Sequence, residues 1–298
     1  MKKDKGTKSS NFGISGRYNH DSSGFYNSKL YAGLENNTKL SNIENPLPED
    51  VKNSIILGSS EQMDKIPDNS VHLMITSPPY NVSKEYDQDL SLEEYLDLLG
   101  KAFKETYRVL VNGGRACINV ANLGRKPYIP LSDYISTMMI ELGFNMRGEV
   151  IWNKAGSASP STAWGSWMSA GNPILRDIHE YILIFSKGSY KRVRKGKENT
   201  ITKQQFIEWT KSVWEMNAVS ARKIGHPAPF PEELPYRLIQ LYSFKKDVVL
   251  DPFIGSGTTA VSALKSNRNY VGYDNDENYV DLAEKRLHPF KAQAKLTM

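Results

Sequence analysis

The sequence predicts an α/β fold, with a mostly parallel, twisted sheet and helices on both of its faces. From residue 54 onward, short apolar runs typical of strands alternate with longer segments of helical periodicity. Helices that connect successive strands place those strands in parallel and cover the sheet on both sides. Two of the strands are followed by turns of unusual composition, one with paired prolines and one rich in glycine. With 298 residues, the chain can bury a sizeable core as one large domain, or as one domain with an inserted lobe.

The first of these two strands ends in a rigid, exposed turn. The apolar run "SVHLMIT" (residues 70–76) is followed directly by Ser77, Pro78, Pro79 and Tyr80. Each proline fixes φ and lacks an N–H donor, so neither a helix nor a strand ladder continues here. Backbone carbonyls therefore point outward beside a hydroxyl and an aromatic ring. This combination suits a planar group that bears an –NH₂, although an ordinary surface turn could have the same residues.

The second strand, "VVL", leads into the loop "DPFIGSGTT" and a helix that opens at Thr258. Gly255 and Gly257 allow backbone amides to approach a ligand closely, and the N-terminus of the helix favours an anionic group. The next strand, residues 269–273, is followed by Asp274, whose carboxylate can accept from both hydroxyls of a ribose. The loop lacks the G-x-G-x-x-G spacing of dinucleotide-binding proteins. This unit predicts a site for a nucleotide-like cofactor.

The remaining elements lie mainly between these two strands. A helix begins at a capping box formed by Ser91 and Glu94, and the triplet "NGG" (residues 112–114) is expected to end it. After that come the strand 115–120, the helix 131–142, and the strands 146–153 and 179–186.

A long connection, residues 154–177, interrupts the alternation of strands and helices. It is rich in Ser and Gly and contains Trp164 and Trp167. Indoles can wedge between bases or stack on them, so contact with DNA is one interpretation. Two tryptophans that anchor the loop to the body of the protein are the other.

A basic segment spans residues 187–203 and contains seven Lys or Arg residues and one Glu. The formal net charge of the whole chain is only +5, so this segment holds more positive charge than the net excess. An isolated charge run is usually a solvated loop, but in a protein that acts on nucleic acid it predicts phosphate contact. The candidate DNA-binding residues of the two stretches are Lys191, Arg192, Arg194, Lys195, Trp164 and Trp167.

The composition predicts a cytoplasmic location. The single cysteine, Cys117, excludes a disulfide framework and lies in a strand pattern typical of the core. The basic N-terminus precedes no apolar stretch, and no run approaches the roughly 18 apolar residues of a membrane span. The histidines and the cysteine show no metal-ligand spacing. Residues 1–45 are polar and without periodicity, which predicts a flexible or partly ordered arm.

Together, "SPPY" and "DPFIGSGTT" resemble the catalytic and cofactor motifs of the S-adenosylmethionine-dependent DNA amino methyltransferases of restriction–modification systems. The catalytic motif comes first, which is similar to the β group and its circularly permuted, Rossmann-like methyltransferase fold. The resemblance covers residues 54–287 and includes "HPAPFPEELPYRLI" from residue 226 onward. It departs at "IILGSS", where Ser59 stands at a position that is often acidic; Glu61 could substitute, and the adenine contact is left unassigned.

The resemblance implies a catalytic domain over residues 46–298, with a small DNA-recognition region inserted within residues 154–222. The residues that it implies for cofactor binding are Asp251, Phe253, Gly255, Gly257, Thr258, Asp274, His226 and Phe230.

The implied chemistry requires the target base to be flipped out of the duplex. Its amino group would bond to the Ser77 side chain and the Pro78 carbonyl, while Tyr80 stacks on the ring. The sulfonium of the cofactor is itself activated, so no metal is implied. With serine at its first position, the motif "SPPY" is similar to that of the cytosine-N4 members. Most adenine-N6 members have aspartate at this position. We therefore expect N4-methylcytosine as the product, with N6-methyladenine as the alternative.

Other functions explain fewer of these features. A nucleotide-dependent oxidoreductase would leave "SPPY" without a role. RNA and protein-glutamine amino methyltransferases share the Pro-Pro-Tyr chemistry, but neither the motif order nor the basic segment. A catalytically inactive DNA-binding subunit stays open. The implied partner is double-stranded DNA, with no membrane; a cognate restriction endonuclease and a homodimer stay open as well.

Overall fold

The computed structural model describes residues 27–31, 40–79, 90–124, 126–154, 165–219 and 230–296. The chain divides into two compact units, residues 1–37 and 38–298. In the smaller unit the described part is a short 3₁₀ helix, η1 (Lys29–Tyr31). Residues 40–45, which the sequence assigned to the N-terminal arm, belong to the larger unit.

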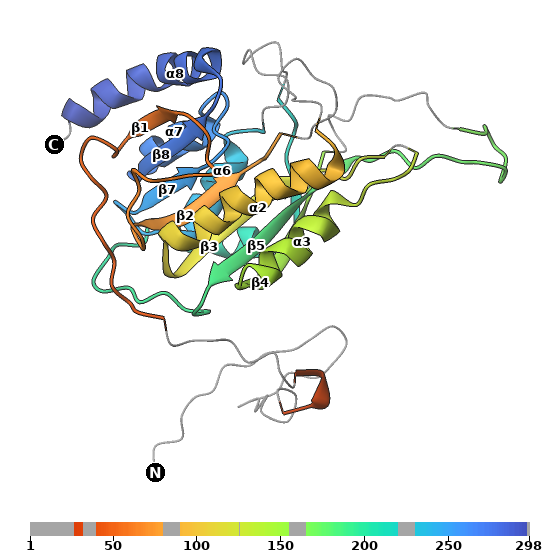
Figure 1. Ribbon diagram of the computed structural model, residues 1–298, viewed down its shortest axis with the longest axis horizontal. Helices are drawn as coiled ribbons and strands as arrows, with labels where there is room; N and C mark the ends of the chain where they lie inside the picture. Colours follow the sequence, from red (N-terminus) through yellow and green to blue (C-terminus); the bar gives the residue numbers. More distant parts are fainter. Residues whose placement is uncertain are drawn as a thin grey trace. The chain divides into compact units, whose positions relative to one another are not determined.

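The larger unit is built on one eight-stranded sheet with the order β1-β8-β7-β2-β3-β5-β4-β6 (Figure 1). The first five strands in this order are mutually parallel, β5 is antiparallel to β3 and β4, and β6 pairs with β4 in parallel. The predicted α/β fold with a mostly parallel sheet is confirmed. The strands are β1 (Ser54–Leu57), β2 (Val71–Thr76), β3 (Leu110–Val120), β4 (Phe144–Asn153), β5 (His179–Lys187), β6 (Val213–Glu215), β7 (Val248–Asp251) and β8 (Asn269–Asp274).

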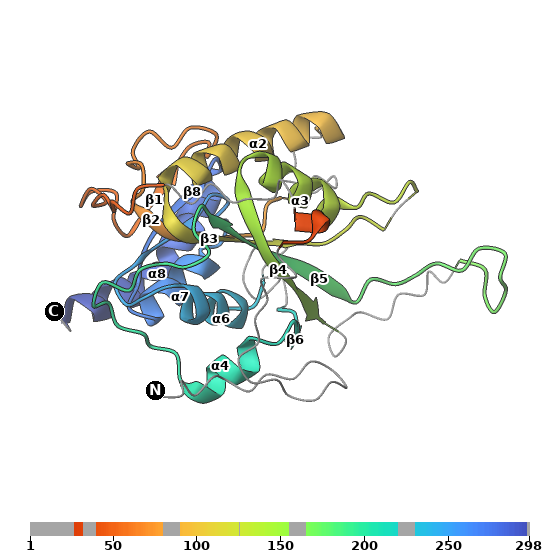
Figure 2. The ribbon, with the colours of Figure 1, turned by 90° about the horizontal axis from the view of Figure 1, so that it is seen from below.

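Helices cover both faces of this sheet, as Figure 2 shows. In β2, Met74 belongs to the core beneath α2 and α3, whereas Leu73 and Ile75 belong to the core beneath α6 and α7. Each such fully buried aliphatic side chain contributes about 1.5–3 kcal/mol. The sequence-predicted core residue Cys117 lies in the second core, where burial raises the pKa of its thiol to about 12. The helices are α2 (Leu92–Val109), α3 (Leu131–Glu141), α4 (Lys203–Trp209), α6 (Glu233–Tyr242), α7 (Thr258–Lys265) and α8 (Glu277–Leu296).

The start of α2 is confirmed, but its predicted end is wrong. Ser91 Oγ accepts from Glu94 N, and the Glu94 carboxylate accepts from Ser91 N, so the capping box forms. The triplet 112–114 does not end the helix, which already stops at Val109; it lies inside β3. There it forms a bulge, because Leu110 and Arg115 pair with residues only two apart on β2. In the described part of the chain, no helix is long and apolar enough to cross a membrane.

Candidate active site

The two sequence motifs meet at the carboxyl edge of the sheet. β2 and β7 are parallel neighbours, with Met74 opposite Leu250, so the turn after Thr76 lies beside the loop after Asp251. The next strand, β8, ends at Asp274 at the same edge. In open α/β sheets, ligands bind outside the carboxyl ends of parallel strands.

Asp251 joins the two motifs from within the protein. Its carboxylate accepts from the Thr76 hydroxyl at 2.7 Å, from the Thr259 hydroxyl at 2.6 Å and from Phe253 N at 3.2 Å. Burial raises the pKa of Asp251 to about 6, although these three donors oppose the shift. The Asp251 side chain, implied as a cofactor contact by the resemblance, is thus turned inward, where it bonds to Thr76, Thr259 and the backbone of the loop.

The glycine loop is closed against β8 and α8. Ile254 N donates to Tyr273 O at 2.9 Å, and Gly255 N donates to the Asp274 carboxylate at 2.9 Å. Gly257 has φ +79°, and a Cβ at this position would lie 2.9 Å from the Cβ of Ala283 in α8. Glycine is therefore required here both by the left-handed backbone and by close packing.

The carboxylate of Asp274 faces backbone donors at the mouth of this loop. Oδ2 accepts from Gly255 N at 2.9 Å and Oδ1 accepts from Asp276 N at 3.0 Å. Partial burial raises its pKa, against these two donors. Each oxygen has a second lone pair, so the carboxylate can still accept from two ligand hydroxyls. These acceptors fit the two hydroxyls of a ribose.

The end of β1 lies next to Asp274, since Gly58 N donates to Asp274 O at 2.8 Å. Beyond it, Ser59 donates to the Glu61 carboxylate at 3.2 Å, and Glu61 is 3.4 Å from Lys101. The structure thus places Ser59 and Glu61 at the carboxyl edge of the sheet, just beyond β1.

The other implied cofactor residues have varied surroundings. The Thr258 hydroxyl accepts from Arg286 of α8 at 3.2 Å, and Arg286 also donates to the Ser256 carbonyl. Phe253 is half-buried against the core beneath α2, and Phe230 is half-buried against the core beneath α6. His226 lies outside the described residues.

At the catalytic motif, Pro78 is buried, and Ser77 and Pro79 are half-buried. Tyr80 lies outside the described residues. Ser77 Oγ is 3.4 Å from the amide nitrogen of Asn119, near the end of β3. That amide is 2.5 Å from the Glu180 carboxylate of β5, which pairs with Lys154 at 2.7 Å.

Sequence reasoning missed Asn119, Glu180 and Lys154 because they belong to no common motif. Asn119 lies near the end of β3, Glu180 at the start of β5 and Lys154 just after β4. These positions indicate a shared edge of the sheet only once β5 is known to be antiparallel to β3 and β4.

Of the two predicted DNA-contacting tryptophans, Trp164 lies outside the described residues. Trp167 lies on a hairpin closed by the bridge between Gly165 and Pro173, which projects from the sheet (Figures 1 and 2). Its side chain is 67% exposed, and the neighbouring Met168 is 88% exposed. Trp167 is therefore largely exposed rather than buried.

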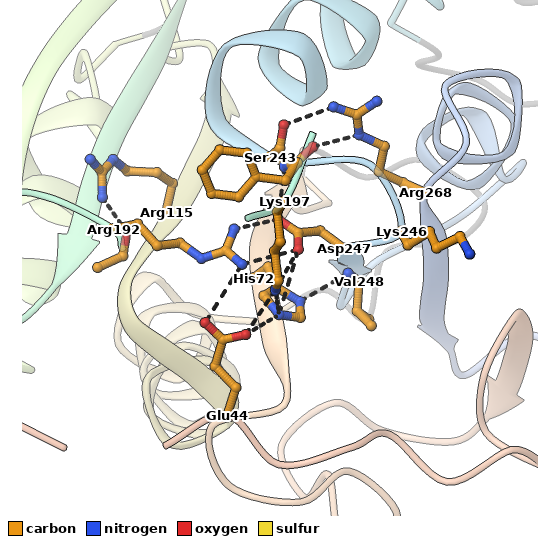
Figure 3. Close-up of polar contacts among 12 residues, drawn as sticks. Glu44, His72, Arg115, Arg192, Lys197, Ser243, Lys246, Asp247, Val248 and Arg268 are labelled. Atoms are coloured by element: carbon orange, nitrogen blue, oxygen red, sulfur yellow. Dashed lines mark hydrogen bonds and ion pairs between the residues drawn. The ribbon is translucent and has the colours of Figure 1, made fainter. Parts of the chain in front are cut away.

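The basic segment lies at the opposite edge of the sheet from Ser77. Figure 3 shows Arg192 and Lys197 around Asp247, which directly precedes β7, together with His72 at the start of β2. Arg192 is only 8% exposed and forms a two-pronged pair with the Asp247 carboxylate. The prediction that Arg192 contacts phosphate is therefore wrong, because its charge is already compensated by Asp247 inside the protein.

The other three basic candidates are exposed at this same edge. The Arg194 side chain donates to Lys197 O at 2.7 Å and Lys195 donates to Asn42 O at 2.9 Å, while Lys191 lies next to Arg192. The structure does not bring any of these residues to the edge that carries Ser77.

Known proteins resemble this chain over most of its length. A family model described as DNA methylase, for N6 and N4 methyltransferases, matches residues 71–285. The Type II methyltransferase M.MjaI of Methanocaldococcus jannaschii is 32% identical over 277 residues, covering 78% of this chain and 90% of the relative. TTHA0409 of Thermus thermophilus, a proposed DNA modification methylase solved with S-adenosyl-L-methionine, superposes with a TM-score of 0.65 at 30% identity. The superposition covers 80% of this chain and 93% of that one.

The cytosine-N4-specific PvuII DNA methyltransferase is 21% identical, with a TM-score of 0.63 over 78% of this chain and 85% of that one, and shares the fold. The chain therefore belongs to the DNA methylase family, with the motif order of the β-group amino methyltransferases.

Proposed function

We propose that this protein transfers a methyl group from S-adenosyl-L-methionine to the N4 amino group of a flipped cytosine within a specific DNA sequence. The observation that carries the proposal is the bond between Thr76 and Asp251. It places the turn that begins at Ser77 directly beside the glycine loop, so an amino group at one and a cofactor at the other would lie close together.

The chain's own residues fit the cofactor. Asp274 would accept from the ribose hydroxyls, and the backbone of the loop at Gly255 and Gly257 would follow the ligand closely. Phe253 would supply a half-buried aromatic surface beside it. When bound, S-adenosyl-L-methionine supplies a methyl group that its sulfonium has already activated.

The turn after β2 would prepare the amino group. The lone pair of an exocyclic amino nitrogen is conjugated with its ring and is a poor nucleophile. Two acceptors, Ser77 Oγ and the Pro78 carbonyl, favour a more tetrahedral nitrogen whose lone pair leaves the ring plane. The two prolines hold these acceptors in place without a competing N–H donor. We propose that Tyr80 stacks on the flipped base.

The choice of cytosine rests on Ser77. A serine hydroxyl is a weaker acceptor than a carboxylate, and it can also donate a hydrogen bond to a ring nitrogen. A serine at this position makes the motif similar to that of the cytosine-N4 enzymes. The N6 amino group of adenine is the competing target.

We propose that the exposed hairpin around Trp167 and Met168 contacts DNA, because aromatic and apolar side chains can stack on bases or wedge between them. A role in protecting DNA from a cognate restriction endonuclease is proposed from the names of the Type II relatives.

Product analysis tests the proposal. The protein would be incubated with DNA and methyl-labelled cofactor, and the DNA digested to nucleosides for mass spectrometry. N4-methylcytosine is expected, and N6-methyladenine as the sole product would overturn the choice of base. Ser77→Ala should retain cofactor affinity and lose about 10²-fold in turnover, the usual scale for a well-placed polar group. Absence of methyl transfer to any DNA would overturn the function and leave a DNA-binding subunit.

A further inference from the structure

A chain of polar side chains leads away from Ser77 along the carboxyl edge of the sheet. It begins at Asn119 near the end of β3, passes to Glu180 at the start of β5, and ends at Lys154 just after β4. Asn119 is 2% exposed, and its amide nitrogen lies 2.5 Å from Glu180 Oε2 and 3.4 Å from Ser77 Oγ. The other oxygen of Glu180 is 2.7 Å from Lys154 Nζ.

The chemistry of these polar side chains determines the orientation of the Asn119 amide. A carboxylate paired with an ammonium accepts hydrogen bonds and does not donate them, so it is the NH₂ side of Asn119 that must face Glu180. One N–H then points to the carboxylate, and the second N–H points to Ser77 Oγ. The amide oxygen, Oδ1, is buried and has no hydrogen-bond partner in the part of the chain that the structure describes.

We propose that Asn119 is a positioning residue for Ser77, held in its orientation by Glu180 and Lys154; this rests on the function proposed above. Once Ser77 Oγ accepts from Asn119, one lone pair of the hydroxyl is occupied on the side of β3. The directions left for its second lone pair and its proton are then restricted. The separation of 3.4 Å is long for an N–H···O bond, as catalytic hydrogen bonds often are before the substrate binds.

The unpartnered Oδ1 favours this role over a purely structural one. A buried polar atom without a partner is costly, and an apolar side chain on β3 would avoid that cost. Glu180 already pairs with Lys154, so Asn119 is not needed to compensate its charge. What Asn119 adds is a donor directed at the residue that begins the catalytic turn.

A double-mutant cycle on the full-length chain tests this inference. Asn119→Ala, Ser77→Ala and the double variant would be compared for kcat and KM on DNA and for the calorimetric Kd of S-adenosyl-L-methionine. Asn119→Ala is expected to lower kcat by about 10²-fold and to leave the cofactor Kd within about twofold. In the Ser77→Ala background, the same substitution should cause no further loss, because the two residues act as one unit.

Asn112→Ala is the matched control, since Asn112 is a buried asparagine on the same strand, bonded to Leu40 O and Asn42 at the opposite edge. It should leave kcat unchanged. Glu180→Gln, which keeps the shape but removes the charge that orients the amide, covers the case in which Asn119→Ala does not fold; a kcat lowered by about tenfold is expected.

Three results would overturn the inference: wild-type kcat in Asn119→Ala, a change in KM alone, or losses that multiply in the double variant. Absence of activity in the wild type would instead overturn the proposed function.

Discussion

The hydroxyl of Thr76 donates a 2.7 Å hydrogen bond to Asp251, a residue 175 positions further along the chain. Thr76 is the last residue of β2, and Asp251 is the last residue of β7. The Thr259 hydroxyl, from the first turn of α7, occupies the other carboxylate oxygen at 2.6 Å. The catalytic turn, the cofactor loop and the following helix are therefore tied to a single buried carboxylate.

Thr76→Val should lower both the free energy of unfolding and turnover. The substitution keeps the shape but removes a donor to a buried carboxylate, a loss of about 1–3 kcal/mol. Thr76→Ser should restore most of both quantities. The control is Thr106→Val, whose buried hydroxyl donates to Ala102 O within α2. Turnover and chemical denaturation of the three variants check this, and equal turnover for Thr76→Val and Thr106→Val would contradict it.

Local sequence signals predicted the elements that carry the site. The apolar run before "SPPY", the glycine loop after β7 and the capping box at Ser91 each depend on residues that are neighbours in the chain. Contacts between distant strands could not be read in this way. The bond of Thr76 to Asp251 and the approach of Asn119 to Ser77 exist only once the strands are ordered in the sheet.

Counting charges within the basic segment gave a wrong prediction for Arg192, again because its partner is distant in the sequence. The basic segment has a large positive excess, but Lys197 pairs with Glu44, which is 153 residues away, and Arg192 pairs with Asp247. A count within the segment does not include these acids. The prediction that the triplet 112–114 ends a helix was wrong for a different reason. Gly113, with φ +76°, forms part of a bulge inside β3.

Asp274→Asn should weaken cofactor binding and also lower the free energy of unfolding, because its amide nitrogen cannot accept from Gly255 N or Asp276 N. The amide replaces an acceptor with a donor beside Gly255 N or beside a ligand hydroxyl, so at least one hydrogen bond is lost. A loss of about tenfold in affinity corresponds to 1.4 kcal/mol. Calorimetry with S-adenosyl-L-methionine measures it, with Asp281→Asn, an exposed acid on α8, as the control. Unchanged affinity in Asp274→Asn would remove this residue from the cofactor site.

Arg192→Met should destabilise the fold strongly. Asp247 is 1% exposed, so removal of its two-pronged partner leaves a buried carboxylate that still pairs with Lys197 at 3.0 Å. Breaking a buried pair on one side typically costs about 3–5 kcal/mol. Lys191→Met, at the exposed neighbouring position, should change the melting temperature little. Thermal unfolding of the two variants tests this prediction. Equal melting temperatures would show that the pair of Arg192 and Asp247 contributes little to stability.

Neutralising Lys191, Arg194 and Lys195 together should leave the salt dependence of DNA binding nearly unchanged. DNA that delivers a base to Ser77 would cover the carboxyl edge of the sheet. The length of β2 alone separates the two edges by roughly 15–20 Å. Binding would be measured over a range of salt concentrations. A decrease of about 0.9 in the slope per residue would restore the interpretation of this segment as a phosphate contact.

Glu44→Gln should destabilise the protein near neutral pH and much less in acid. Val248 N donates to His72 Nδ1 at 2.9 Å, so His72 carries its proton on Nε2, which faces Glu44 at 3.3 Å. Burial holds the pKa of His72 below its usual value, although Glu44 and Asp247 oppose the shift. The hydrogen bond from His72 holds the pKa of Glu44 well below its ordinary value of 4.5, and Lys197 adds to the effect.

A carboxylate with a lowered folded-state pKa contributes stability that is present above its unfolded pKa and is lost as pH falls through the folded one. The difference in melting temperature between the wild type and Glu44→Gln should therefore be largest above about pH 6 and shrink toward about pH 3. Glu49→Gln, at a side chain that is 85% exposed, serves as the control and should show little difference at either pH. A difference for Glu44→Gln that stayed constant from pH 7 to pH 3 would mean that its carboxylate is not held ionised by His72 and Lys197.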